Sequence, residues 1–548
     1  MNRYRGYVLF LAAVLVYGIA AMIQRVPGYM DAEYYYTSGV AFTSTGQYVE
    51  PYLWNYLNNP DTIESPANSY WMPAATLLTA LSSWLFHTSS FGIVRLIFLL
   101  IAAFIPPLTA SLAYTVDEKA MENQRHRRAW MAGLLAVFPG YYLTLLTLPE
   151  TFGLYMVFGT LFLMLGNRTG LLNIRSTEKI KYCQKHLAGF GMLGVLAGMM
   201  HLSRADGLIW LAAGFGLWLM INNRQWKDGN LQTWSMLASG GLLVCGYLAV
   251  MGWWLGRNFL TFGSFLPPGG SLTIWLTEYD QTFAYPARSV LNFTNWWAGG
   301  IWAALMARLQ ALWMNIKTLL GVQGLVFWLP LAAVGGWKLR RHTIVWAGLI
   351  MWLTTLAVMT LVFPFSGARG GYLHSSAALQ PLVWVLAVIG FEESIRFFSQ
   401  KRGWDASQSF RVLGSGLILI TVFATGFIYY LRVIGPNPAE PLWEQDRRVY
   451  QRMDATLSQW HIGMDTPVMI NEPPGFFAAT GRKAIVIPYG DTDTLIQVAC
   501  RYGARDILVD RDLPKGLMEL FSQPGTQNGL ELRFDGGDFL YYFVRDCP

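Results

Sequence analysis

The sequence MDAEYYY at residues 30–36 follows a fully apolar run at residues 7–22, and these two stretches decide the fold class. The apolar run, with Arg3 and Arg5 before it, predicts a retained first membrane span. Asp31 and Glu33 then lie close to the point where that helix leaves the membrane, in a chain with only 13% charged residues. Carboxylates also favour helix N-termini, so this stretch alone permits a purely structural role.

The composition indicates an integral membrane protein. Hydrophobic residues make up 53% of the chain and aromatic residues 15%, and they gather in long runs. No phosphate-binding loop or dinucleotide fingerprint is present, which argues against nucleotide hydrolysis and hydride transfer. Four cysteines are too few for a disulfide scaffold, and a bond between Cys500 and Cys547 stays open.

The apolar runs predict about eleven membrane spans. They are expected at residues 7–22, 92–115, 129–146, 152–165, 187–202, 208–221, 233–255, 319–337, 343–363, 375–391 and 412–431. Residues 73–85 are apolar but too short for a full span, so an interfacial or re-entrant helix is expected there.

The distribution of basic residues predicts the orientation. With the N-terminus inside, the inner segments hold 20 Lys and Arg, against six in the outer segments before residue 432. This satisfies the positive-inside rule, so we expect a cytoplasmic N-terminus and an extracytoplasmic C-terminus, in an inner or plasma membrane. The net charge of +7 combines +11 before residue 432 with −4 from that residue onward, so the positive excess belongs to the membrane half and is no sign of nucleic-acid binding.

The chain divides into two expected domains. Residues 1–434 form the membrane domain, with long outer loops at 23–91 and 256–315, and residues 435–548 form a small extracytoplasmic α/β domain. In the second domain, short apolar runs predict strands at 468–471, 484–487, 507–509, 530–534 and 539–544. Helices are predicted at 440–460 and 494–501.

Further polar residues are expected on the side of the membrane that carries Asp31. They are Glu150, Arg204, Asp206, Arg369 and the histidines at 201 and 374. Ionisable residues at membrane depth are costly and suggest function. The structural alternatives are a helix cap for Glu150, an ion pair for Arg204 with Asp206, a tight turn around Arg369, and hydrogen-bonded histidines at 201 and 374.

In this order and topology the motifs resemble the GT-C glycosyltransferases, membrane enzymes that take sugars from polyprenyl-phosphate carriers. The likeness is to relatives of the protein mannosyltransferases and the lipid A aminoarabinose transferase. It rests on the acidic motif after the first span, on YWMP at 70–73, on LPE at 148–150, on SRADG at 203–207, on Arg369 and on the soluble tail. The family commonly has adjacent Asp and Glu, whereas here Ala32 separates Asp31 from Glu33.

The resemblance implies that Asp31 is catalytic, as the general base of a single inverting displacement. Arginine binds phosphate bidentately, which makes Arg204 and Arg369 candidate ligands of the carrier phosphate. A divalent cation at Asp31 and Glu150 stays open, because carboxylates suit hard metals. The other candidate substrate-binding residues are Glu33, Glu150, Asp206, Tyr70, Trp71 and His374.

The expected partners are a polyprenyl-phosphate sugar donor, membrane lipid and a protein, lipid or glycan acceptor. The alternatives are a secondary transporter or flippase and a non-catalytic membrane scaffold that displays its tail. Transporters commonly show repeated halves and charges near the bilayer midplane. This sequence shows no matching halves, and its charges cluster at the outer ends of the spans.

Overall fold

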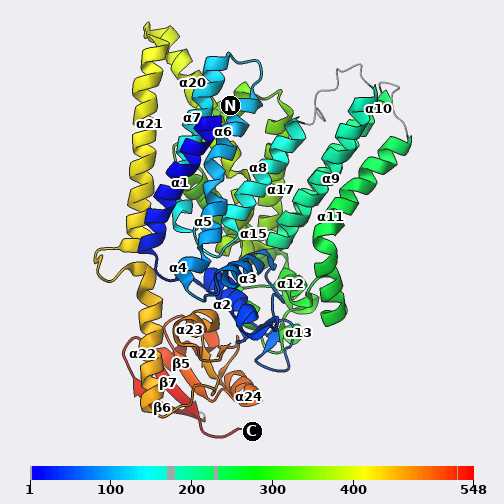
Figure 1. Ribbon diagram of the computed structural model, residues 1–548. Helices are drawn as coiled ribbons and strands as arrows, with labels where there is room; N and C mark the ends of the chain where they lie inside the picture. Colours follow the sequence, from blue (N-terminus) through cyan, green and yellow to red (C-terminus); the bar gives the residue numbers. More distant parts are fainter. Residues whose placement is uncertain (1–2, 169–178, 228–232, 527–528, 548) are drawn as a thin grey trace.

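The computed structural model describes residues 3–168, 179–227, 233–526 and 529–547, and most of them are helical (Figure 1). Seven helices in these ranges are long and apolar enough to cross a bilayer, or eight if one bent pair is counted. The seven are Tyr4–Ile23, Phe91–Val116, Ala205–Asn223, Thr233–Phe262, Thr343–Val362, Pro364–Arg402 and Ala406–Ile434. The polytopic helical class is thus confirmed, whereas the count of about eleven spans is not.

Two predicted spans are only short apolar helices, Phe152–Asn167 and Leu187–Ser203. A third prediction, 129–146, is wrong beyond residue 137, because helix α7 (Glu122–Val137) stops there. Pro139 follows and Gly140 has φ +65°, a left-handed conformation that ends the helix and turns the chain into a short 3-10 segment, η1 (Gly140–Thr144).

The predicted span 319–337 is broken. The helix Gly300–Gln323 and helix α16 (Trp328–Lys338) meet at an angle of 89°. Between them, Leu325 has φ +40° and Val326 has φ +61°, conformations that a continuing α-helix does not allow. A stretch whose overall apolar composition predicts one span therefore contains a sharp bend.

The helices of the bundle and its loops have the following bounds: α1 Arg3–Ile23, α2 Met30–Thr45, α3 Ala74–Phe86, α4 Phe91–Val94, α5 Leu96–Ala103, α6 Ile105–Val116, α8 Phe152–Arg168, α9 Lys179–Ser203, α10 Leu208–Lys227, α11 Thr233–Phe262, α12 Pro268–Leu272, α13 Ala287–Val290, α14 Phe293–Ala298, α15 Gly300–Thr318, α17 Thr343–Ala357, α18 Pro364–Ser366, α19 Tyr372–Ser376, α20 Gln380–Arg402 and α21 Ala406–Tyr429. A two-stranded ladder, β1 (Val49–Glu50) with β2 (Ser65–Pro66), lies in the first outer loop.

The C-terminal part contains the predicted small sheet, in the strand order β4-β3-β5-β7-β6. Strand β3 pairs in parallel with β4 and β5, and β7 pairs antiparallel with β5 and β6. The strands are β3 Val468–Ile470, β4 Ala484–Val486, β5 Asp506–Val509, β6 Leu530–Asp535 and β7 Leu540–Val544, with helices α22 Gln445–Gln459, α23 Pro473–Thr480, α24 Thr492–Tyr502 and α25 Met518–Ser522. A disulfide joins Cys500 to Cys547.

The edge strand β4 is covered by the first outer loop. The backbone N–H of Leu53 donates to the carbonyl of Ala484 at 3.0 Å, and the N–H of Val486 donates to the carbonyl of Leu53 at 2.7 Å. Leu53 therefore extends the sheet by one bridged residue, and it joins the two halves of the chain through backbone contacts.

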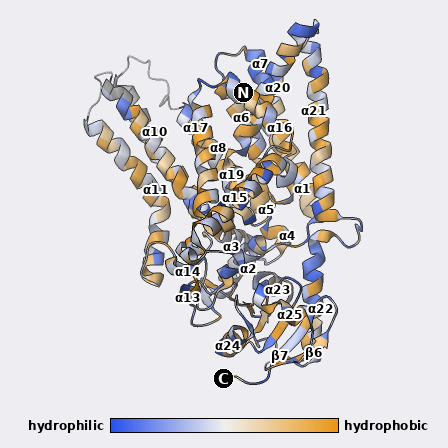
Figure 2. Cartoon of the chain, turned by 180° about the vertical axis from the view of Figure 1, so that it is seen from behind, coloured by the Kyte–Doolittle hydropathy of each residue, from blue (hydrophilic) through white to orange (hydrophobic). Residues whose placement is uncertain are grey.

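The two ends of the bundle differ in character. The N-terminus and the α20–α21 turn lie at one end, while α2, α3, α12 and the sheet gather at the other (Figure 1). The long helices are mainly hydrophobic, and hydrophilic residues concentrate at the two ends and on α22 (Figure 2). The end that carries α2 and the sheet is therefore the place where the polar sequence motifs can lie together.

A buried ion network holds α7 to α20 at the N-terminal end, and it supports a stability prediction. Glu392 accepts hydrogen bonds at 2.6 Å from both Arg127 and Arg128, and Arg128 is 2% exposed. We expect Glu392→Ala to lower the free energy of unfolding by about 3–5 kcal/mol, because it leaves a buried guanidinium short of a partner. Thermal unfolding in detergent measures the loss.

The neighbouring Glu393 provides the matched control. Its partners Lys338 and Arg396 are 43% and 39% exposed. We expect Glu393→Ala to cost about 0–1 kcal/mol, because exposed ion pairs contribute little. Equal losses for the two variants would contradict a special role for the buried network.

Candidate active site

Helix α2 carries Asp31 in its first turn, immediately after a tight bend from α1. The bend requires Gly28, which has φ +78° and packs so closely on Trp443 that a Cβ atom would lie 2.1 Å from the indole Nε1. The same indole nitrogen donates to the carbonyl of Val26 at 3.0 Å. The start of α2 is thereby fixed against a residue that lies just before α22.

Asp31, Glu150 and His374 meet at this end of the bundle, from three distant parts of the chain. Each offers a ligand atom, and these atoms all lie within 4.8 Å of one another. His374 Nδ1 is 3.0 Å from Glu150 Oε1, and His374 Nε2 is 3.6 Å from Asp31 Oδ2. Among the described residues this is the one such group of His, Cys, Asp and Glu.

The local sequence holds each member in place. Glu150 precedes α8, and the Thr151 hydroxyl donates to its Oε1 at 3.0 Å. The Phe152 ring stacks on the His374 imidazole with 4.1 Å between centroids. His374 follows a kink at Gly370, whose φ of +128° explains the glycine in this turn.

Two buried atoms in the group lack hydrogen-bond partners among the described residues. They are Glu150 Oε2 and His374 Nδ1, which lies near Glu150 without hydrogen-bond geometry. Unsatisfied buried polar atoms are rare and call for an explanation. Two carboxylates and an imidazole form a donor set that suits a divalent first-row cation, so these residues fit a metal.

Burial raises the pKa values of both carboxyl groups, and repulsion by Glu150 adds to the rise at Asp31. The pKa of Asp31 rises to about 6 because of burial and the nearby Glu150, although His374 and Arg204 act in the opposite direction. The pKa of Glu150 rises to about 7 because of burial, opposed by the Thr151 hydrogen bonds and by Arg204. Both groups therefore titrate close to neutral pH.

Arg204 and Asp206 lie beside this group, in the turn between α9 and α10. Arg204 Nε donates to Asp206 Oδ1 at 2.9 Å, and the Tyr155 hydroxyl donates to Asp206 Oδ2 at 3.1 Å. No hydrogen bond joins the two terminal guanidinium nitrogens of Arg204 to another described residue. Asp206 thus orients Arg204 and leaves the two terminal guanidinium nitrogens available to bind an anion.

Arg369 lies at the outer edge of the site. Its guanidinium stacks over the Tyr279 ring, 4.3 Å from the centroid, and the residue is exposed. Tyr279 in turn is near enough to Asp31 and Tyr70 for their charges to raise its pKa, after the larger effect of burial. Arg369 is therefore connected to the Asp31 group through Tyr279.

Tyr70 and Trp71 form an aromatic wall with Trp54 rather than contacting the Asp31 group directly. The Trp54 and Trp71 rings stack at 4.2 Å with 8° between their planes, and Tyr70 meets Trp54 edge-on at 5.0 Å. Nothing in the sequence singled out Trp54, because residues 50–69 have no clear periodicity.

Glu33 points away from Asp31. A Cβ atom added to Gly475 would lie 2.5 Å from Glu33 Oε2, so the Glu33 carboxylate faces the start of α23. Residues two apart on a helix project about 200° from each other, which separates the two side chains. The structure therefore places Glu33 at the contact between α2 and the C-terminal part.

Comparison with known proteins gives structural relatives only. No protein-family model and no curated protein sequence matches the chain. The oligosaccharyltransferase AglB from Archaeoglobus fulgidus, solved with an inhibitory peptide and a dolichol-phosphate, aligns with TM-score 0.56 at 11% identity over 99% of this chain and 74% of that one. ArnT from Cupriavidus metallidurans, solved in the apo state, aligns with TM-score 0.51 at 12% identity over 98% and 97%.

The chain has the GT-C fold. Both relatives are GT-C glycosyltransferases, and the alignments cover nearly all of this chain, so the resemblance is confirmed at the level of fold. Identities of 11% and 12% do not establish the reaction or its residues. Those must be argued from the site.

The structure adds residues to the site that sequence reasoning missed. Tyr279 supports Arg369, Tyr155 supports Asp206 and Phe152 supports His374. Tyr155 and Phe152 belong to an apolar helix, where aromatic residues are expected for packing alone. No local signal separates such a residue from its neighbours.

Proposed function

We propose that the protein is a membrane glycosyltransferase that moves a sugar from a polyprenyl-phosphate carrier to an acceptor on the extracytoplasmic face. The observation that carries this proposal is the convergence of Asp31, Glu150 and His374 beside the unengaged terminal nitrogens of Arg204. The GT-C fold and the dolichol-phosphate bound to AglB support the lipid-phosphate donor. The position of the group at one end of the bundle argues against a transport site at the midplane.

In the proposed reaction, Asp31 accepts the proton of an acceptor hydroxyl or amide. The acceptor heteroatom attacks the anomeric carbon and forms the new glycosidic bond. The bond from that carbon to the phosphate oxygen breaks, and its electron pair leaves with the carrier phosphate. One displacement inverts the anomeric centre.

The phosphate gains negative charge as it leaves, and arginine stabilises that charge. Arg204 offers two terminal nitrogens and is held rigidly by Asp206, so little order is lost when phosphate binds. Arg369 is exposed beside the site and is the proposed second phosphate ligand. Its cation–π contact with Tyr279 limits the orientations of its guanidinium.

Asp31, Glu150 and His374 are the residues that would hold a divalent cation. Such an ion supplies Lewis-acid stabilisation of negative charge when bound. The chain's own contribution is to hold two carboxylates and an imidazole together in a mainly buried site.

The direct test is transfer of radiolabelled sugar by the purified full-length protein. Short-chain polyprenyl-phosphate sugars serve as donors, and membrane extract supplies acceptors. We expect labelled product from at least one donor, and the product identifies the acceptor class. If no donor binds or reacts, while a polar solute crosses vesicles that contain the protein, a transporter is the better explanation.

The pKa values predict how activity depends on pH. Both carboxyl groups must be deprotonated to act as base or metal ligand, so activity should fall as the pH drops through about 7 and 6. Because these folded-state pKa values exceed the normal ones, the folded protein binds more protons, and these groups make it less stable as pH rises.

Activity and stability should therefore change in opposite directions across this range. Initial transfer rates and thermal midpoints between pH 5 and pH 8 measure both quantities at the two pKa values. Saturating divalent cation should move the activity profile to lower pH, because metal and protons compete for the same carboxylates. A flat activity profile would contradict the assignment.

A further inference from the structure

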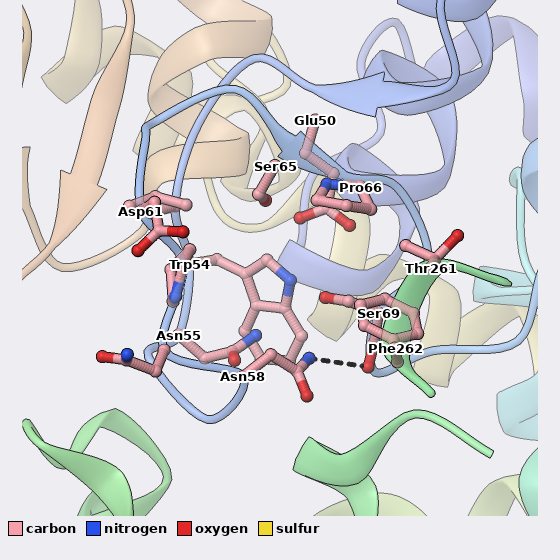
Figure 3. Close-up of a pocket in the computed structure, with 13 residues that line it drawn as sticks. Glu50, Trp54, Asn55, Asn58, Asp61, Ser65, Pro66, Ser69, Thr261 and Phe262 are labelled. Atoms are coloured by element: carbon pink, nitrogen blue, oxygen red, sulfur yellow. Dashed lines mark hydrogen bonds between the residues drawn. The ribbon is translucent and has the colours of Figure 1, made fainter. Parts of the chain in front are cut away.

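A cavity lies in the first outer loop, between residues 50–69 and the end of α11 (Figure 3). Its volume is about 210 Å³, and its polar lining includes Asn55, Asn58, Asp61, Ser65 and Ser69 around the indole of Trp54. This volume lies below the roughly 300–1,000 Å³ of sites for drug-sized ligands, so it suits one small ring.

The frame of the cavity is rigid. The Asn58 side chain donates to the carbonyl of Ser69 at 3.0 Å and accepts from the N–H of Gly269 at 2.6 Å, which uses both ends of its amide. Trp54 is fixed by its stack on Trp71. A preformed cavity avoids part of the ordering cost of binding.

Other lining groups carry hydrogen-bond donors that no described residue uses. Asn55 Oδ1 accepts from the N–H of Leu57 at 3.1 Å, while its Nδ2 donates to no described residue. The hydroxyls of Ser65 and Ser69 likewise form no hydrogen bond with a described residue, although both residues are buried. These groups line the cavity and are open to solvent there, so a polar ligand would take the place of water as their partner.

The charge of the cavity excludes anions. No Lys, Arg or His is among the lining residues. Glu50 accepts hydrogen bonds from the Tyr34 hydroxyl and from the N–H of Asn68, and burial raises its pKa to about 8. Asp61 lies at the rim, 3.6 Å from Arg501. The interior is therefore polar and close to neutral, unlike the Asp31 site.

We propose that this cavity binds a neutral sugar ring, distinct from the one transferred. Sugar hydroxyls both donate and accept hydrogen bonds, which matches the amides and hydroxyls of the lining. The cavity adjoins the Trp54–Trp71–Tyr70 wall. Its use as a subsite rests on the proposed function; the binding itself does not.

Binding is tested on the full-length protein in nanodiscs by saturation-transfer NMR with methyl glycosides of neutral hexoses and N-acetylhexosamines. We expect at least one to bind, and Asn55→Asp to weaken it about tenfold, because the substitution keeps the Oδ1 acceptor of the turn and removes the free donor. Ser65→Ala removes a second hydroxyl and should weaken binding by several fold.

Asn437→Asp is the matched control. Asn437 Oδ1 accepts from the N–H of Ala439 at 3.2 Å, which is the same kind of turn in an exposed segment. Asn437→Asp should leave glycoside binding unchanged. Three results would overturn the proposal: failure of every neutral glycoside to bind, unweakened binding in both Asn55→Asp and Ser65→Ala, or a preference for charged sugars. Asp31→Asn should keep glycoside binding, so this result is independent of whether transfer occurs.

Competition identifies the source of the sugar. If a short-chain prenyl-phosphate sugar displaces the methyl glycoside while prenyl phosphate alone does not, the cavity holds the transferred sugar, and the proposal of a distinct ring is overturned. If donor and glycoside bind together, the cavity holds a sugar of the acceptor, as proposed.

Discussion

Asp31→Asn should lower the rate of sugar transfer by roughly 10²–10⁴-fold, because a positioned general base contributes about that much. The substitution preserves shape and removes one of two mutually repelling carboxylates, so thermal stability should be unchanged or higher. Initial rates with a polyprenyl-phosphate donor, measured beside thermal unfolding, separate lost chemistry from lost folding.

Asp405→Asn is the matched control for this substitution. Asp405 caps the start of α21, where its carboxylate accepts from the N–H of Gln408, and the residue is exposed at the opposite end of the bundle. Asparagine caps helices about as well as aspartate, so activity should be retained. Normal turnover by Asp31→Asn would remove Asp31 from the catalytic role.

Removal of divalent cations by a strong chelator should abolish transfer, and one re-added metal should restore it. The physical reason is the buried group of Asp31, Glu150 and His374, in which two polar atoms lack partners. Metal content by mass spectrometry should fall and recover in step with activity. Full activity in protein free of metal would show that the three side chains act without an ion.

His374→Ala should weaken metal affinity by at least about 10–100-fold, the loss seen even for residues that only support a ligand. Manganese titration monitored by electron paramagnetic resonance measures this affinity without any need for turnover. His126→Ala is the control, because His126 also pairs with a carboxylate, at 2.9 Å from Glu122, but belongs to α7 at the other end of the bundle. Unchanged affinity in His374→Ala would exclude that imidazole as a ligand.

Charge in an apolar context was an informative signal in this sequence. Asp31, Glu150 and Arg204 are costly residues at the ends of apolar runs, and the structure brings them to one end of the bundle. Short apolar runs likewise predicted all five strands of the C-terminal sheet. Both signals are local, which explains why they can be read without a structure.

Other features depend on contacts that no local pattern records. The bend after Gln323 lies within a run whose apolar composition predicts one continuous span, and composition alone does not register Gly324 and Pro330 beside the bend. His374 joins Asp31 and Glu150 across 343 and 224 residues of chain, so no ligand spacing could reveal the group. By contrast, the separation of Glu33 from Asp31 follows from helical geometry once α2 is known to be a helix.

The bridge between Leu53 and strand β4 has a consequence for how the protein is made. Leu53 is translated early, and its backbone partners at residues 484–486 are translated late. Until they arrive, the loop that carries Trp54 lacks part of its support, and afterwards the sheet has no open edge on that side. The first outer loop can therefore complete its folding only after residues 484–486 have been synthesised. A chain truncated before residue 484 would insert into the membrane, but Leu53 would lack its backbone partners.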